Sequence, residues 1–227
     1  GDLKGVSVSV NKGETVAIVG ATGAGKSTII NLINRFYEID SGTISIDSIP
    51  LEDYELSSLR NQIAIVLQDV FLFSDSILNN ITLKNSLITE SQVIDAAKKI
   101  GIHDFIMTLP GGYHYNVKER GVMLSSGQRQ LIAFLRAYVS SPRILILDEA
   151  TSSVDSYAEQ MIQYATDTIT RGRTSIIIAH RLATKKKTDK IIVWDKGVIV
   201  KEGTHRELLK KSNGYYKNLY DKQYSLE

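Results

Sequence analysis

Eight consecutive residues have the types and spacing of a phosphate-binding loop: Gly20-Ala21-Thr22-Gly23-Ala24-Gly25-Lys26-Ser27. Glycines let backbone N–H groups turn toward phosphate oxygens, and the start of a following helix adds the positive end of its dipole. In such a loop Lys26 reaches the β- and γ-phosphates, and the hydroxyl of Ser27 binds Mg²⁺. The alternative is a glycine-rich turn that fits the pattern by chance.

The segments on either side of this loop favour the phosphate-binding interpretation. Residues 14–19 (ETVAIV) form a short apolar run that is typical of a buried strand. Residues 26–37 predict a helix, because their apolar side chains recur on one stripe: Ile29, Leu32, Ile33 and Phe36. A strand, a glycine loop and a helix in this order predict that residues 20–28, from Gly20 to Thr28, cradle phosphates.

A second group of chemically competent residues follows the apolar run of residues 144–147 (ILIL). Parallel sheets bind ligands beyond the carboxyl ends of their strands. A nucleotide-hydrolysing site needs an acid that holds Mg²⁺ and a group that orients or deprotonates the attacking water. Asp148 fits the first role and Glu149 the second. The alternative is that the acidic pair only ends a strand. The phosphate-binding loop in the same chain makes this alternative less favoured than the catalytic interpretation.

The segment Leu124-Ser125-Ser126-Gly127-Gln128 precedes a predicted helix that runs to Ser140. Ser125 and Gln128 fit the S-x-x-Q pattern of a capping box, which is a purely structural interpretation. The same helix start could also bind an anion. Because the chain already has one phosphate loop, a second cradle is best explained if it faces the nucleotide of another molecule. This predicts a symmetric dimer with the nucleotide between the two subunits.

Two further polar residues follow predicted strands. His180 comes after residues 175–179 and could donate a hydrogen bond to the γ-phosphate, or it could be an ordinary surface or packing residue. Gln68 comes after residues 63–67, and its amide could reach Mg²⁺ or the attacking water, or simply bond the backbone. Neither assignment stands without the other motifs.

The hydrophobic pattern predicts an α/β fold with a helical insertion. Continuous apolar runs at 63–67, 144–147 and 175–179 predict strands buried on both faces of a parallel sheet, and alternating runs at 4–10 and 42–47 predict antiparallel strands. Between residues 70 and 141 strand patterns disappear, and helices are expected at 76–81, 90–100 and 128–140. A hairpin turn is predicted between residues 190–194 and 198–201. Thr204 is expected to cap a helix over 206–211. A last helix is expected to carry Tyr216, Tyr220 and Tyr224 on one face, which we expect to pack against the core.

The composition is that of an ordinary folded protein and limits the chemistry. The chain of 227 residues has no cysteine, so disulfides and thiolate metal sites are excluded. Its four histidines lack metal-ligand spacing, and no stretch approaches the roughly 18 apolar residues of a membrane span. The net charge is +2, and the basic run at 185–187 is best explained as a solvated loop, so no nucleic acid is expected. No signal peptide opens the chain. It starts with Gly1 rather than methionine and ends in Leu226-Glu227, which suggests a segment excised from a longer chain.

Together these motifs resemble the ATP-binding cassette (ABC) ATPase family over essentially the whole chain, 1–227. The resemblance implies ATP and Mg²⁺ as ligands and a P-loop NTPase (RecA-like) α/β core with an antiparallel β subdomain and a helical subdomain at about 70–141. It assigns Walker A to residues 20–28, the Q-loop to Gln68, the signature to residues 124–128 and Walker B to residues 144–148. It further implies a catalytic Glu149, a switch His180 and a D-loop at 152–155 that ends in Asp155.

Glu119-Arg120-Gly121, residues 70–81 and residues 202–209 resemble exporter-type cassettes more narrowly. In exporters a transmembrane domain precedes the cassette and docks near the Q-loop, so we expect a membrane domain absent from this chain and a location on the cytoplasmic face of the cell membrane. Ser126 and Lys118 stand where the family commonly has glycine. The aromatic residue that stacks on adenine would lie before Gly1, so no residue here is assigned that role.

The leading hypothesis is therefore the motor domain of an exporter, paired with a second cassette as a homodimer or heterodimer. One alternative is a soluble ABC ATPase of translation, DNA repair or chromosome organisation, but the segment between Lys26 and Asp148 leaves no room for a coiled coil. Another is a nucleotide-sensing half of an asymmetric pair, which the loss of Glu149, Ser125 or His180 would have favoured. The transported substrate is not encoded in these residues.

Overall fold

The computed structural model describes residues 6–20, 42–46, 49–50, 63–67, 70–118, 124–149, 156–195, 198–210 and 216–217. The chain forms two compact units, which we describe separately. The first contains residues Gly1–Ile63, Ile146–Glu149 and Gly172–Glu227, and the second contains Ala64–Leu145 and Ala150–Arg171. Within the described ranges, every helix is too short or too polar to cross a membrane.

A mixed sheet with the strand order β11-β10-β2-β9-β8-β5 carries the candidate site. Its strands are β2 (Thr15–Val19), β5 (Ile63–Val66), β8 (Ile144–Asp148), β9 (Thr174–Ile178), β10 (Lys190–Asp195) and β11 (Val198–Gly203). β2 pairs in parallel with β10 on one side and with β9 on the other. β10 and β11 form an antiparallel hairpin, which confirms the prediction for this segment.

The apolar runs of the sequence become the buried centre of this sheet. All five residues of β9 are buried, as are the first four of β8 and the last four of β2. The prediction of complete burial is wrong for residues 63–67, where only Val66 is buried and Leu67 is 46% exposed. β5 ends the strand order, and an edge strand has a neighbour on one side only.

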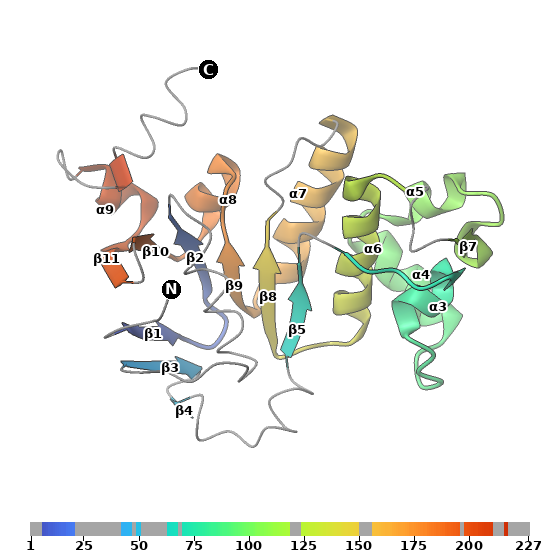
Figure 1. Ribbon diagram of the computed structural model, residues 1–227, viewed down its shortest axis with the longest axis horizontal. Helices are drawn as coiled ribbons and strands as arrows, with labels where there is room; N and C mark the ends of the chain where they lie inside the picture. Colours follow the sequence, from blue (N-terminus) through green and yellow to red (C-terminus); the bar gives the residue numbers. More distant parts are fainter. Residues whose placement is uncertain are drawn as a thin grey trace. The chain divides into compact units, whose positions relative to one another are not determined.

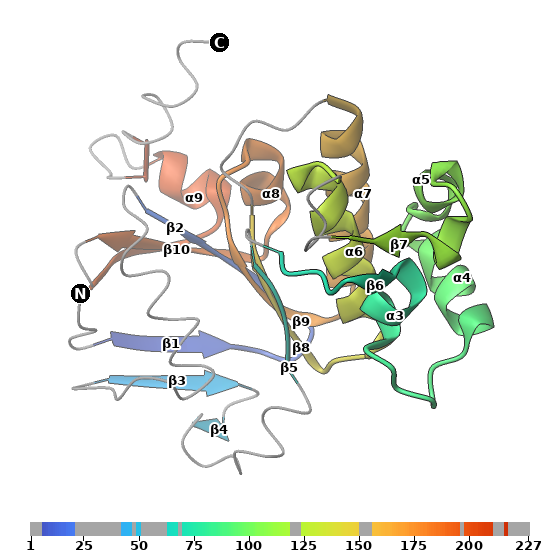
Figure 2. The ribbon, with the colours of Figure 1, turned by 45° about the vertical axis from the view of Figure 1, so that its right-hand side comes forward.

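A smaller sheet in the first unit has the order β1-β3-β4, formed by Val6–Val10, Gly42–Ile46 and Ile49–Pro50. β3 pairs antiparallel with β4, a two-residue strand that the sequence did not predict. The prediction of antiparallel strands is wrong for β1 and β3, which pair in parallel with each other (Figure 2). Alternating apolar and polar residues indicate one buried face and do not fix strand direction. Here β2 and the residues up to 41 separate the two strands, which is long enough for the crossover that parallel pairing needs.

Two short helices complete the described part of the first unit. α8 (Leu182–Lys187) follows β9, and α9 (His205–Lys210) follows β11. The interpretation of residues 185–187 as a solvated loop is wrong, because they form the last turn of α8 and Lys185 is buried. Thr204 caps α9 as predicted, because its hydroxyl accepts a hydrogen bond from the Glu207 N–H at 3.1 Å. Tyr216 is 2% exposed, and its hydroxyl lies 2.6 Å from Nδ1 of His205, so this tyrosine packs in the core as expected.

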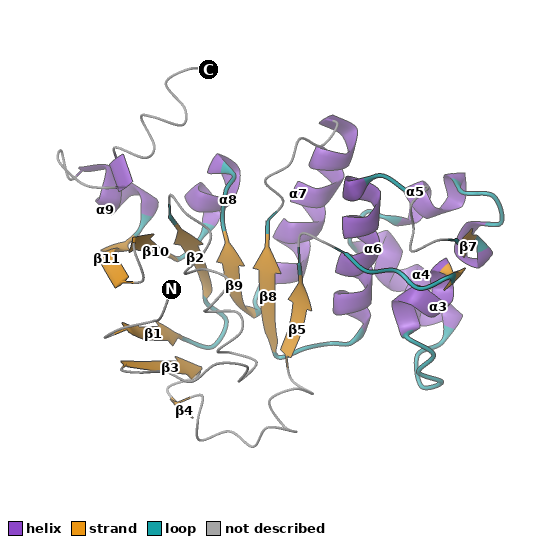
Figure 3. Cartoon of the chain, viewed as in Figure 1, coloured by secondary structure: helices purple, strands orange, loops and turns teal. Residues whose placement is uncertain are grey.

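The second unit is mainly helical (Figures 1 and 3). Its helices are α3 (Ile77–Thr82), α4 (Glu90–Lys99), α5 (His103–Thr108), the 3₁₀ turn η2 (Gly112–His114), α6 (Ser126–Val139) and α7 (Ser156–Thr170). α3, α4 and α6 match the predicted helices within two residues. The sequence interpretation missed α5 and the 15-residue helix α7. It also missed the pair of two-residue strands β6 (Asp75–Ser76) and β7 (Asn116–Val117), which are too short to show a period.

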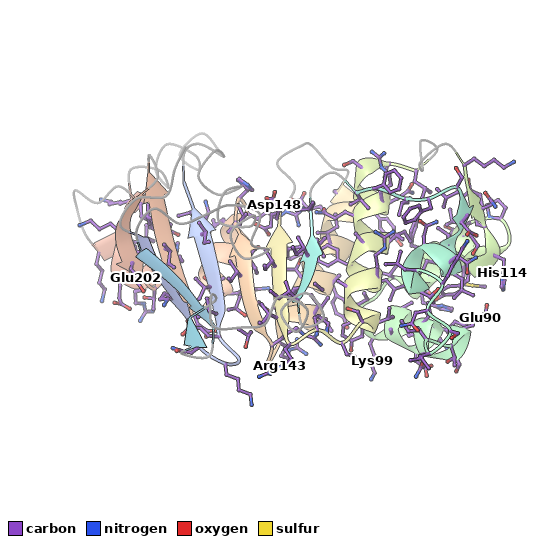
Figure 4. All side chains as sticks on the ribbon, turned by 60° about the horizontal axis from the view of Figure 1, so that its bottom comes forward. Glu90, Lys99, His114, Arg143, Asp148 and Glu202 are labelled. Atoms are coloured by element: carbon purple, nitrogen blue, oxygen red, sulfur yellow. The ribbon has the colours of Figure 1, made fainter. Side chains whose placement is uncertain are left out.

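Specific contacts hold the helices of the second unit. Gly101 follows α4 with a φ of +78°, and a Cβ there would lie 2.8 Å from the ring of Tyr164 on α7, so this turn requires glycine. Glu90, at the start of α4, pairs with His114 of η2, with 2.9 Å between Oε1 and Nε2 (Figure 4).

Candidate functional site

Three of the residues predicted from the sequence come together at one edge of the sheet. Gly20 follows β2, Glu149 follows β8 and His180 lies two residues after β9. β9 stands between β2 and β8, and the arrows of all three strands point the same way (Figure 3). Asp148, the last residue of β8, lies at the same edge (Figure 4). This is the carboxyl edge, where parallel sheets bind their ligands.

The carboxylate of Glu149 is buried and anchored on the segment that follows β9. The residue is 3% exposed. Its Oε1 accepts hydrogen bonds from the backbone N–H groups of His180 at 2.8 Å and Arg181 at 3.1 Å. The Glu149 N–H donates to the carbonyl of Ile178 at 3.1 Å, which continues the β8–β9 contact beyond the strands. The Glu149 side chain is therefore bonded to the backbone of His180.

The second carboxylate oxygen of Glu149 has a partner that sequence reasoning missed. Oε2 accepts a 2.5 Å hydrogen bond from the hydroxyl of Thr184, which is itself 3% exposed. Thr184 is 35 residues away from Glu149, on the short helix α8. Its only sequence signal is its place four residues after His180, which does not distinguish it from a packing threonine.

Several predicted ligands fall outside the described residues. They are Ala21, Thr22, Gly23, Ala24, Gly25, Lys26, Ser27, Thr28, Gln68 and Asp155. Their assignments stay predictions from the sequence. The strand that leads into the loop is described: β2 is buried up to Val19, and the Ala179 N–H donates to the Ile18 carbonyl at 2.9 Å. The chain thus leaves the sheet at Gly20, beside the end of β9.

The signature segment forms the capping box that its spacing predicts. The Ser125 hydroxyl accepts from the Gln128 N–H at 3.1 Å, and the Gln128 side chain accepts from the Ser125 N–H at 3.0 Å. Ser125 is exposed at the start of α6, whereas Gly127 is buried within the first turn. The structural interpretation is therefore correct, and the geometry keeps the Ser125 side chain at the surface, where it could also meet an anion.

A pair of exposed aromatic residues lies just after Gln68 in the chain. Phe71 and Phe73 are 50% and 52% exposed, and their rings are in edge-to-face contact with centroids 4.9 Å apart. Asn80 is fully buried and holds the backbone of Phe73: its side chain accepts from the Phe73 N–H at 2.8 Å and donates to the Phe73 carbonyl at 3.1 Å. Two exposed rings on a fixed backbone form a preorganised apolar surface.

Arg136 of α6 supports the same segment. Its Nε donates to the carbonyl of Asn80 at 2.8 Å, and one of its terminal nitrogens donates to the carbonyl of Phe71 at 3.3 Å. Burial lowers the pKa of the guanidinium, but an arginine stays charged at neutral pH. Through Arg136, α6 is bonded directly to the backbone of Phe71.

Known proteins share both the sequence and the fold of this chain. The family model described as ABC transporter matches residues 3–152. Proteins of Staphylococcus aureus strains NCTC 8325 and COL, both named as multidrug export ATP-binding/permease proteins, are 51% identical over 221 residues, which is 97% of this chain and 38% of theirs. The chain thus spans about two fifths of the length of these relatives.

A solved structure has the same architecture. It is described as a bacterial Atm1-family ABC exporter with ATP bound, is 42% identical and superposes with a TM-score of 0.85 over 95% of this chain and 37% of that one. The family model covers well over half of the chain, and the likeness in fold confirms the predicted P-loop NTPase architecture. On these grounds the chain belongs to the ABC transporter family.

Proposed function

We propose that this chain is the ATP-binding and ATP-hydrolysing domain of an exporter, and that two such domains close head to tail around two ATP molecules to drive transport across a membrane. The observation that carries the proposal is the carboxyl edge of the sheet, where Gly20, Glu149 and His180 follow three adjacent strands. A phosphate loop, an acid and a switch residue at one edge are what ATP hydrolysis requires.

In this proposal different residues at the edge bind the phosphates, take the proton and orient the water. Lys26 and the N–H groups of residues 20–28 bind the phosphates, and Glu149 takes the proton of the attacking water. His180 holds the γ-phosphate, and Gln68 helps to orient the water. The anchoring of Glu149 on the His180 and Arg181 N–H groups supports this arrangement, because it ties the base to the switch segment.

The residues present fit a magnesium ion of the kind that accompanies nucleotides. Such an ion is held by one or two protein oxygens, phosphate oxygens and water. Asp148 offers a carboxylate at the strand end, and Ser27 and Gln68 are the other expected ligands. When bound, Mg²⁺ would neutralise phosphate charge. No group of three or more acidic or histidine side chains stands at one place among the described residues, so a protein-only metal cage is not proposed there.

The signature helix is proposed to serve the nucleotide of the partner subunit. A hydroxyl that accepts one hydrogen bond can still donate its hydrogen, so the capping role of Ser125 is compatible with a phosphate contact. Gly127 and Gln128 would shape the same first turn, and Asp155 would lie at the dimer contact. The partner is a second ABC ATPase domain, identical or related.

The apolar surface of Phe71 and Phe73 is proposed as the docking site of the transmembrane domain, near Gln68 and on the cytoplasmic face of the membrane. Half-exposed aromatic rings with a fixed backbone lose little entropy on binding and are typical anchors of interfaces. The names of the relatives, which join export, ATP binding and permease, favour an exporter over a soluble ABC ATPase of translation, DNA repair or chromosome organisation.

The test uses Glu149→Gln in the purified chain. The substitution keeps the shape of the side chain but removes the basic oxygen, so ATP hydrolysis should fall by about 10²–10⁴-fold while ATP binding persists. ATP that is not hydrolysed should hold the closed dimer, which size-exclusion chromatography would detect as an ATP-dependent shift. Asp148→Asn is the control: it should weaken Mg²⁺ binding and give little dimer. Unchanged hydrolysis by Glu149→Gln would contradict the assignment of the base.

A further inference from the structure

The hydroxyl of Thr184 donates to Oε2 of Glu149 inside the protein. We propose that Thr184 is a positioning residue for ATP hydrolysis, and that this hydrogen bond fixes the plane of the Glu149 carboxylate. The inference rests on the proposed function, because it assumes that Glu149 is the base.

The two carboxylate oxygens are held in different ways. Oε1 accepts from the backbone N–H groups of His180 and Arg181, and these donors exist whatever side chains stand there. Oε2 accepts from a side chain, so this contact depends on the residue type at position 184. Of these three donors, Thr184 is therefore the one whose hydrogen bond can be removed by a side-chain substitution.

The terminal torsion of glutamate is broad, so the plane of a carboxylate is set by its contacts. The two N–H groups on Oε1 restrain rotation about the last bond, and the Thr184 hydroxyl on Oε2 adds a restraint at the other oxygen. Contacts on both oxygens hold the plane more firmly than contacts on one. A general base must present a lone pair to the proton that it takes, and the orientation of that lone pair follows from this plane. Catalytic groups typically need support of this kind to stay within about 0.5 Å of the productive geometry.

Burial makes the Thr184 hydroxyl hard to replace. Thr184 and Glu149 are each 3% exposed, so bulk water has little access to the oxygen that the hydroxyl serves. Valine has the shape of threonine without the hydroxyl and would put a methyl group against Oε2. Serine retains the donor and loses only the methyl group. The two substitutions separate hydrogen bonding from packing.

The first measurement compares steady-state ATP hydrolysis by the purified chain and its Thr184 variants. Thr184→Val should lower kcat about tenfold or more with KM for ATP unchanged, because misplacing a catalytic group by about 1 Å can cost about 100-fold. Thr184→Ser should stay within about twofold of the unsubstituted chain. Thr166→Val is the matched control: this threonine of α7 is also 3% exposed, but its hydroxyl donates to the Ile162 carbonyl at 2.8 Å. It should leave kcat unchanged. If Thr184→Val does not fold, Thr184→Ala carries the same test.

The second measurement is a double-mutant cycle with Glu149→Gln. If Thr184 acts through the carboxylate, Thr184→Val should have almost no further effect on the residual rate of the Glu149→Gln protein. A tenfold loss in that background as well would overturn the proposal, as would a normal kcat for Thr184→Val beside a rate that falls with Glu149→Gln. If Glu149→Gln itself leaves the rate unchanged, the proposed function fails instead.

Discussion

Glu149 and Ser125 are anchored in opposite ways, and the difference shows how far a sequence specifies a site. The Ser125 side chain is exposed and bonded to a residue three positions along, in one turn of α6. The Glu149 carboxylate is buried and bonded to residues 31 to 35 positions later in the sequence. Helix α7 lies between them in the sequence. The first contact is local and could be anticipated from spacing. The second exists only once β8 and β9 lie together.

The side chain of Asn80 is intermediate between these two. It bonds the backbone of Phe73, seven residues earlier, and it is fully buried. We expect buried contacts between distant residues to contribute more to stability than exposed local ones. The free energy of unfolding should therefore fall most for Glu149→Ala, less for Asn80→Ala and least for Ser125→Ala. Chemical denaturation of the purified chain would measure all three.

The largest loss is expected for Glu149→Ala. The substitution leaves the N–H groups of His180 and Arg181 and the hydroxyl of Thr184 without this acceptor inside the protein. Unsatisfied buried donors cost about 1–3 kcal/mol each, so we expect a loss of about 2–3 kcal/mol after relaxation. Asp95→Asn is the control, since Asp95 is exposed on α4, and its loss should stay within about 0.5 kcal/mol. Equal losses for the two variants would contradict the ranking.

Asn80→Ala should cost about 1–2 kcal/mol and loosen the aromatic pair. The Phe73 N–H and carbonyl lose the side chain that bonds them both. Hydrogen exchange at the Phe73 amide should accelerate in this variant. Asn79→Ala is the neighbouring control, because Asn79 is only partly buried and its side chain donates to Asp75 at 2.8 Å. It should leave exchange at Phe73 unchanged; faster exchange there would argue against a specific role of Asn80.

Ser125→Ala should cost about 1 kcal/mol through the lost helix cap and should also impair ATP-dependent dimerisation. Thr89→Ala separates the two effects, because Thr89 forms the same capping box at the start of α4, where its hydroxyl accepts from the Gln92 N–H at 3.1 Å. It should cost a similar free energy and leave the dimer of a Glu149→Gln background intact. If both variants impair that dimer equally, Ser125 acts only through stability.

The smallest effect concerns pH. Burial raises the pKa of Tyr113 to about 12, with the charges of Asp104 and Glu90 adding to the shift. A raised tyrosine pKa means that the neutral form is favoured in the folded state, so its contribution is complete below the ordinary value of 10.0 and is lost as pH rises toward about 12. The unfolding free energy should therefore fall over this range, and Tyr113→Phe should make the fall shallower. A fall of the same steepness in Tyr113→Phe would assign it to other groups.

The sequence predicted much of the fold because its signals were either periodic or local. The apolar runs of β8 and β9, the hairpin of β10 and β11, and the caps at Ser125 and Thr204 all follow from spacing within a few residues. Its errors concern quantities that depend on neighbours. The direction of β1 relative to β3 and the partial exposure of β5 are set by which strands pair, and that information is spread along the chain.

By itself, the sequence determined that this protein is an α/β ATPase domain of the ABC family, because the residue types of its motifs and their order admit few other interpretations. The tertiary structure decided how those residues are held. In the folded protein, one carboxylate oxygen of Glu149 accepts from the His180 N–H and the other accepts from the Thr184 hydroxyl. Asn80 bonds the backbone of Phe73, and Arg136 bonds the backbone of Phe71. The physical reason is that a hydrogen bond acts over about 3 Å in space, whatever the separation of its partners along the chain.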